Sequence, residues 1–90
     1  MSDVDETTAP AGEDALVEAT VLRQLLALHP IQLNLDELLR EVDADPADFA
    51  QRDAVERAVH ELVAAGLLHR SGELLLASRA ALRFDALLGE

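Results

Sequence analysis

The side chains with catalytic or metal-binding chemistry are widely spaced in this chain of 90 residues. The three histidines, His29, His60 and His69, lack the i, i+4 or His-x-His spacing that metal sites commonly show. There is no cysteine, which excludes thiol nucleophiles, disulfides and cysteine-bound zinc. No Ser-His-Asp set, glycine-rich phosphate loop or carboxylate pair follows from the spacing. We therefore expect no enzyme activity, no metal or cofactor site and no small-molecule substrate.

The densest group of possible cation ligands is an acidic run of Glu41, Asp43, Asp45 and Asp48. This run lacks the glycine and the terminal glutamate of a calcium-binding loop. A solvated loop between two helices accounts for it better.

The basic side chains are all arginine, and their distribution is uneven. Residues 1–50 hold two arginines and twelve acidic residues, whereas residues 51–90 hold five arginines and six acidic residues. The net charge of −11 is therefore concentrated in the first half of the chain. Arginine binds phosphates and guanine well, so the second half holds the candidate contacts to double-stranded DNA. Since Phe49 and Phe84 are the only aromatic residues, stacking on single-stranded nucleic acid is not expected.

The first helix is expected to begin near Asp14, a suitable N-cap, and to end before Pro30. Residues 1–14 combine acids, Thr, Pro and Gly without apolar periodicity, which predicts a disordered acidic tail. The folded domain should then span residues 15–90. The acidic start lacks the apolar segment of a signal peptide, and no apolar run is long enough to cross a membrane. A cytoplasmic protein is the expectation.

A short second helix is expected after Asn34, because Glu37 completes a capping box three residues later. Before it, Ile31–Leu33 alternates apolar and polar residues and predicts a short strand that pairs beside a hairpin.

The third helix is expected to open at Asp53, where Glu56 gives a second capping-box spacing, and to end at Gly66. A single helical turn over Pro46–Ala50 should precede it and bury Phe49. Ser78 is the expected cap of a fourth helix. The apolar side chains that this helix should return to the core are Ala80 or Ala81, Phe84, Leu87 and Leu88.

A β-hairpin over Leu67–Ala77 is the clearest local signal, because two short apolar runs flank the dipeptide Ser71-Gly72. A two-residue turn at this dipeptide would place Leu68 opposite Leu75.

The stretch AVERAVHELVAAGLLHRSGELLLASRAALRF runs a helix of pattern V-x-x-A-V-x-x-L-V-x-x-G-L-L directly into the hairpin. With the order helix, short strand, helix, helix, hairpin, helix, it resembles the winged helix-turn-helix superfamily of small bacterial transcription regulators, over Ala15–Leu88. The resemblance implies an α+β, mostly helical fold whose third helix is the recognition helix and whose hairpin is the wing. It implies Arg57, His60 and Arg70 at a DNA groove. The residues implied near phosphates are Arg52, Arg79 and Arg83.

The outward face of the expected recognition helix holds only Arg57 and His60 as useful donors, among Asp53, Glu56 and Glu61. A DNA-binding domain should instead present a basic face, because phosphate neutralisation supplies much of its affinity. Two functions therefore stay open. One is a dimeric DNA-binding transcription regulator, and the other is an acidic winged-helix module that binds protein and not DNA.

The run Leu74-Leu75-Leu76 predicts that both faces of the hairpin need cover, because successive strand residues face opposite sides. The leucine side chains on the outward face are either Leu68 and Leu75, or Leu67, Leu74 and Leu76. The fourth helix could cover this set, or a protein partner or a second copy could do so. The expected dimer or partner interface comprises Leu22, Leu26, Leu68, Leu75 and Leu82.

Overall fold

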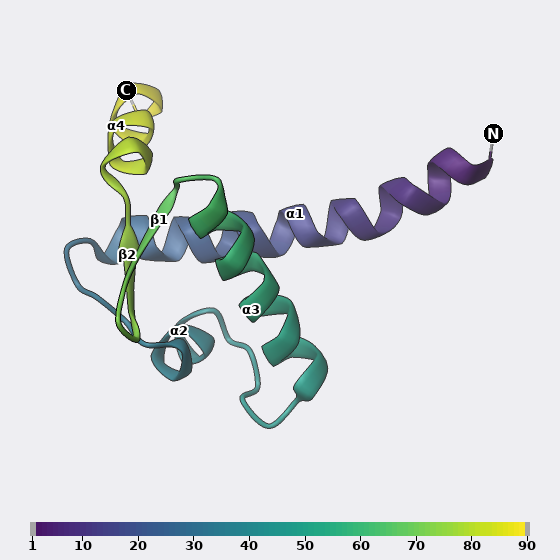
Figure 1. Ribbon diagram of the computed structural model, residues 1–90, viewed down its shortest axis with the longest axis horizontal. Coiled ribbons are helices and arrows are strands. Elements are labelled where there is room, and N and C mark those ends of the chain that lie inside the picture. Colours follow the sequence, from purple (N-terminus) through teal and green to yellow (C-terminus); the bar gives the residue numbers. More distant parts are fainter. Residues whose placement is uncertain (1, 90) are drawn as a thin grey trace.

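In this computed structural model the chain forms four helices and one antiparallel hairpin, an α+β fold that is mostly helical, as expected (Figure 1). The structure describes the backbone of residues 2–89 and the side chains of residues 13–89. The elements are α1 (Ser2–Leu28), α2 (Leu35–Glu41), α3 (Phe49–Ala64), β1 (Leu68–Ser71), β2 (Leu74–Ala77) and α4 (Arg79–Leu88). Within this described part, no helix combines the length and apolar character needed to cross a membrane.

Helix α1 ends at Leu28, before Pro30, as predicted, but its helical backbone begins at Ser2 and not near Asp14. A helix that has already formed can add residues without apolar contacts, so periodicity is a poor guide to its first turn. The disordered tail predicted for residues 1–14 falls mostly on residues 1–12, whose side chains lie outside the described residues, and it stays a prediction.

The core lies where α1 crosses α3 and where α2 and the hairpin close the remaining sides (Figure 1). Val21 and Leu25 of α1 are fully buried, as are Leu38 and Leu39 of α2. Helix α3 contributes one apolar stripe at i, i+3, i+4 and i+7 spacing. Its buried members are Val55, Ala58, Val59 and Leu62.

The hairpin is present, but its register differs from the prediction by two residues. Ser71 pairs with Leu74, so the turn residues are Gly72 and Glu73 instead of Ser71 and Gly72. Gly72 has a φ of +62°, which suits the first central position of a tight hairpin turn. The short strand predicted at Ile31–Leu33 is reduced to a single bridge. In it, the Leu33 amide donates to the Leu75 carbonyl at 3.1 Å.

The hairpin turns Leu68 and Leu75 inward, with exposed fractions of 3% and 0%, while Leu74 is 39% exposed. The prediction that Leu68 and Leu75 form a partner interface is therefore wrong. Both side chains are covered within the chain, because Leu75 lies between β1 on one edge and the bridge to Leu33 on the other.

Helix α3 begins at Phe49, and its N-cap is Asp48, whose side chain accepts from the Ala50 and Gln51 amides. The predicted start at Asp53 is wrong, since Asp53 lies inside the helix. The early start also places Phe49 on the first turn of α3, where it is 86% exposed and not buried as predicted. By contrast, Asn34 and Glu37 form the predicted capping box at the start of α2.

Ser78 caps α4 as predicted, but the helix contributes only Ala81 to the buried residues. The prediction that its larger apolar side chains return to the core is wrong, because Phe84, Leu87 and Leu88 are 60%, 65% and 68% exposed. The physical reason is the direction of the helix, which continues from β2 past α1 and away from the core (Figure 1).

Candidate functional site

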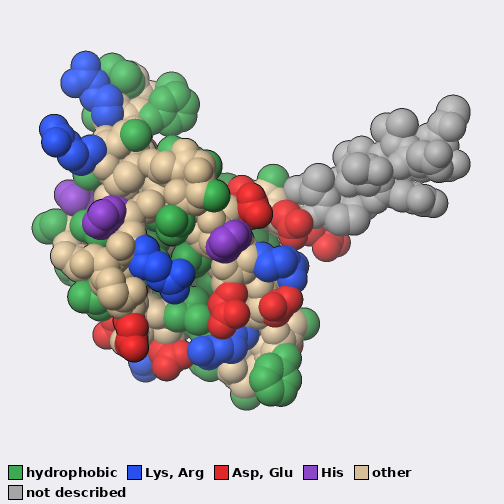
Figure 2. All heavy atoms as spheres, viewed as in Figure 1, with side chains coloured by type: hydrophobic (Ala, Val, Ile, Leu, Met, Phe, Trp, Pro, Cys, Tyr) green, Lys and Arg blue, Asp and Glu red, His purple; other side chains and the backbone are tan. Residues whose placement is uncertain are grey.

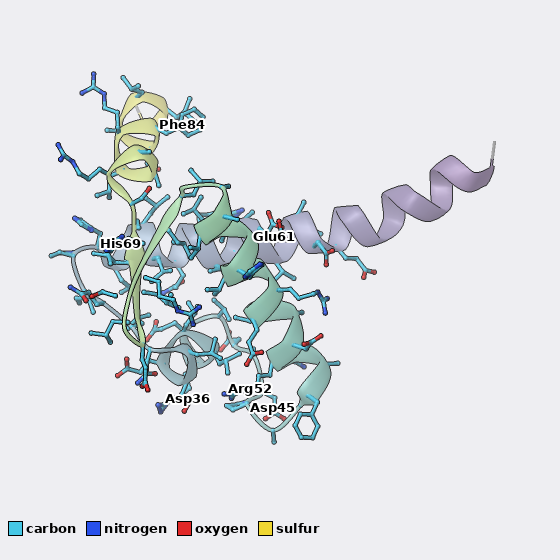
Figure 3. All side chains as sticks on the ribbon, viewed as in Figure 1. Asp36, Asp45, Arg52, Glu61, His69 and Phe84 are labelled. Atoms are coloured by element: carbon cyan, nitrogen blue, oxygen red, sulfur yellow. The ribbon has the colours of Figure 1, made fainter. Side chains whose placement is uncertain are left out.

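Two arginines predicted to contact DNA are already paired with acids of α3 and of the neighbouring helices α2 and α1. Arg52 lies on the side of α3 that faces α2, with its Nη1 atom 3.1 Å from Asp36 and its Nε atom 3.4 Å from Glu56 (Figure 3). Arg57 pairs with Asp53 on the same helix, and its Nη2 atom lies 3.7 Å from Asp14 on α1. A phosphate would have to compete with these carboxylates for both guanidinium groups.

The structure brings together the three residues predicted for a DNA groove, since Arg57, His60 and Arg70 line one shallow depression between α3 and the hairpin. The same depression is also lined by acids, namely Asp53, Glu56 and Glu61. We call this surface the α3 face. Its acids outnumber its arginines, which makes it a poor match for a polyanion.

The remaining predicted phosphate contacts, Arg79 and Arg83, are exposed on α4. Among the described residues, no acid lies within ion-pair distance of these two arginines or of Arg70. On the side shown in Figure 2, the arginines of α4 stand apart from the acidic side chains, which gather over α2, α3 and α1. The six predicted contacts therefore do not form one continuous basic stripe.

A second surface is an apolar groove between α1 and α4, which we call the α1/α4 groove. Leu22 and Leu26, both predicted as interface residues, are half-buried in its α1 wall, while Leu82 is half-buried on α4 outside the lining. The α4 wall holds Phe84 and Leu88, which the sequence placed in the core (Figure 3). The remaining lining residues are Ala19, Arg23, Leu67, Ala80, Ala81 and Asp85.

The two walls of the α1/α4 groove carry charges of opposite sign. Arg23 lies on the α1 wall and Asp85 on the α4 wall, and no ion pair joins them among the described residues. Apart from this pair, every lining side chain is apolar. The groove thus offers a continuous apolar floor with one positive and one negative edge.

In the acidic run before α3, two aspartate side chains accept hydrogen bonds from backbone amides of the same segment. Asp45 accepts from the Ala47 amide at 2.9 Å and Asp48 from the Ala50 amide at 2.9 Å. Within the part of the chain that the structure describes, no group of three His, Asp or Glu residues is placed to hold a metal ion.

Comparison with known proteins gives no assignment, because no protein-family model, no curated protein and no solved structure matches the chain. The geometry defines a small α+β domain with two contrasting surfaces, an α3 face with more acids than arginines and an apolar α1/α4 groove. Functional inference therefore depends on these two surfaces.

Proposed function

We propose that this chain is a winged-helix protein-interaction module that forms a symmetric dimer through the α1/α4 groove. The order of α1, the Leu33 bridge, α2, α3, the hairpin and α4 supports a winged-helix assignment. The acids that surround the arginines of α3 favour a protein partner over DNA.

The observation that carries the proposal is the exposure of Phe84 and Leu88, 60% and 68%, because both side chains line the α1/α4 groove. Small monomeric proteins rarely expose a contiguous apolar patch of this kind unless it is a binding surface. Aromatic side chains are also common anchors of interfaces, and Phe84 is one of only two aromatics in the chain.

The charges on the α1/α4 groove favour a second copy of the chain as its occupant. A two-fold axis would bring Arg23 of one copy to the partner's Asp85, and the reverse, so that two ion pairs form. Helix α4 has two arginines and one aspartate, whereas the chain as a whole carries a net charge of −11. Two such chains therefore repel each other less at this groove than at their acidic surfaces.

Measuring the mass in solution by light scattering tests this proposal. We expect a species of twice the 9.7 kDa chain mass, and we expect Phe84→Ser to shift it toward the monomer. Phe49→Ser is the matched control, because Phe49 is the other exposed aromatic and lies on α3. A monomeric wild-type chain at high micromolar concentration, or equal effects of both variants, would contradict the proposal.

A second candidate function is DNA binding by a regulator of this architecture. The observation that favours it is that, among the described residues, Arg70, Arg79 and Arg83 form no ion pair. Binding to duplex DNA at low salt tests it, because even non-specific binders retain DNA there at micromolar concentration. Retention that is lost in Arg70→Gln would support this candidate. No retention by the wild-type chain would exclude it.

A further inference from the structure

A second apolar groove lies between α1 and α3, on a surface separate from the α1/α4 groove. We call it the α1/α3 groove. It has a volume of about 280 Å³ and is open to solvent beside Leu16, which is 69% exposed. Its lining residues are Leu16, Val17, Thr20, Val21, Val42, Asp43, Ala44, Gln51, Ala54 and Val55. This volume is below the usual range for small-molecule sites but suits one or two apolar side chains.

Carboxylates lie on one side of the α1/α3 groove. Asp43 belongs to its lining. Gln51, another lining residue, accepts from the Asp45 backbone amide at 2.7 Å and donates to the Asp48 carboxylate at 3.3 Å, so these two aspartates lie next to a lining residue. No lining residue is basic. The groove therefore combines an apolar floor with a negatively charged edge.

The charge at this groove identifies the chemistry of its occupant. A second copy would bring another chain of net charge −11 against these carboxylates, and nucleic acid or an anionic lipid surface would be repelled in the same way. An amphipathic helix with apolar side chains on one face and Lys or Arg beside them matches both properties, because such helices bind in apolar grooves through side chains one turn apart.

We propose that the α1/α3 groove binds a basic amphipathic helix of a partner protein. An apolar side chain of that helix packs beside Leu16 and Val55, and its cationic side chains meet the carboxylates of Asp43, Asp45 and Asp48. This interaction does not depend on the proposed dimer, whose groove is formed by other residues of α1 and by α4.

The test uses a fluorescent, N-acetylated 14-residue peptide of Leu and Lys, with Leu at i, i+3, i+4 and i+7 spacing. Titration of the full chain should give saturable binding, with backbone amide shifts centred on residues 16–20 and 51–55. We expect Leu16→Ser to weaken binding about tenfold and Asp43→Asn about two- to fivefold. The matched control, Ile31→Ser, changes another exposed aliphatic residue that lies outside both grooves and should leave peptide affinity unchanged.

Three outcomes would overturn the inference. The first is equal affinity for Leu16→Ser and the wild type, and the second is shifts spread over all acidic surfaces. The third is equal binding of a peptide in which Glu replaces Lys. Light scattering separates this inference from the proposed dimer, because Leu16→Ser should retain the wild-type mass while Phe84→Ser should reduce it.

Discussion

At the scale of single residues, Leu74 and Leu75 are sequence neighbours with opposite environments. Leu75 is 0% exposed, so Leu75→Ala should lower the free energy of unfolding by about 2–5 kcal/mol through lost apolar contacts and a residual cavity. Leu74→Ala is the matched control, and it should cost less than about 1.5 kcal/mol, because Leu74 is 39% exposed. Urea denaturation measures both. Equal losses would mean that the hairpin faces are wrongly assigned.

The capping box of α2 gives a second prediction at this scale. The Asn34 side chain accepts from the Glu37 amide at 2.8 Å, and the Glu37 carboxylate accepts from the Asn34 amide at 2.9 Å. Asn34→Ala should therefore destabilise the fold by about 1 kcal/mol. The control is Gln32→Ala, an exposed position nearby, which should leave the urea midpoint unchanged. A midpoint in Asn34→Ala equal to that of the control would contradict the role of the cap.

The capping residues of the helices were predictable from the sequence where only one nearby residue satisfied the local capping rules. Asn34 and Ser78 are the caps expected from the sequence, and Gly66 has the positive φ, +82°, expected after α3. At the start of α3, however, both Asp48 and Asp53 satisfy local capping rules. Local spacing alone does not choose between the two.

At the scale of elements, the hairpin was predictable but its register was not. Glycine suits either central position of a two-residue turn, so the sequence did not choose between Ser71-Gly72 and Gly72-Glu73. The two registers differ by two residues along β2, which leaves Leu68 and Leu75 on the same face in both. The bridge to Leu33, a contact distant in sequence, accompanies the observed register.

The attachment of α4 leads to a prediction at this scale. The Ser78 hydroxyl donates to the Gly66 carbonyl at 2.7 Å and accepts from the Ala81 amide at 3.1 Å, so it joins α4 to the end of α3. Ser78→Ala should cost about 1 kcal/mol and speed amide hydrogen exchange in α4 more than in α3. Ser71→Ala, in the exposed hairpin, is the control. Unchanged exchange in α4 would show that other contacts hold this helix.

At the scale of the whole molecule, the fold class and the order of elements were predictable from periodicity. The exposure of Phe84 was not, because an apolar stripe on a helix has the same spacing whether it faces its own core or a partner. The two walls of the α1/α4 groove therefore differ in how well the sequence predicted them. Leu22 and Leu26 were predicted from the sequence as interface residues, whereas the exposure of Phe84 and Leu88 depends on the direction of α4.

Salt should strengthen the proposed dimer. Each chain carries a net charge of −11, so assembly brings two strongly negative molecules together, and screening reduces that repulsion. Sedimentation equilibrium at 20 mM and 500 mM NaCl should show tighter association at the higher concentration. DNA binding would show the opposite dependence, because salt weakens phosphate contacts. Weaker self-association in high salt would contradict the charge argument.

Reciprocal charge reversal tests most directly whether two copies of the chain meet in a two-fold interface at the α1/α4 groove. Arg23→Glu places like charges at both proposed pairs of its own dimer, and so does Asp85→Arg. A heterodimer of the two variants restores both ion pairs. In one pair the two substituted side chains attract each other. In the other pair the unsubstituted Arg23 of one chain meets the unsubstituted Asp85 of the other. Because exposed pairs contribute about 0.2–1 kcal/mol each, the loss of two pairs should make each variant alone associate roughly two- to thirtyfold more weakly than the wild type.

The measurement is the dissociation constant, by sedimentation equilibrium, of each variant alone and of the equimolar mixture. We predict weak association of each variant and recovery of wild-type affinity in the mixture. Equal affinities for the wild type and both variants, or a mixture no tighter than its components, would contradict it.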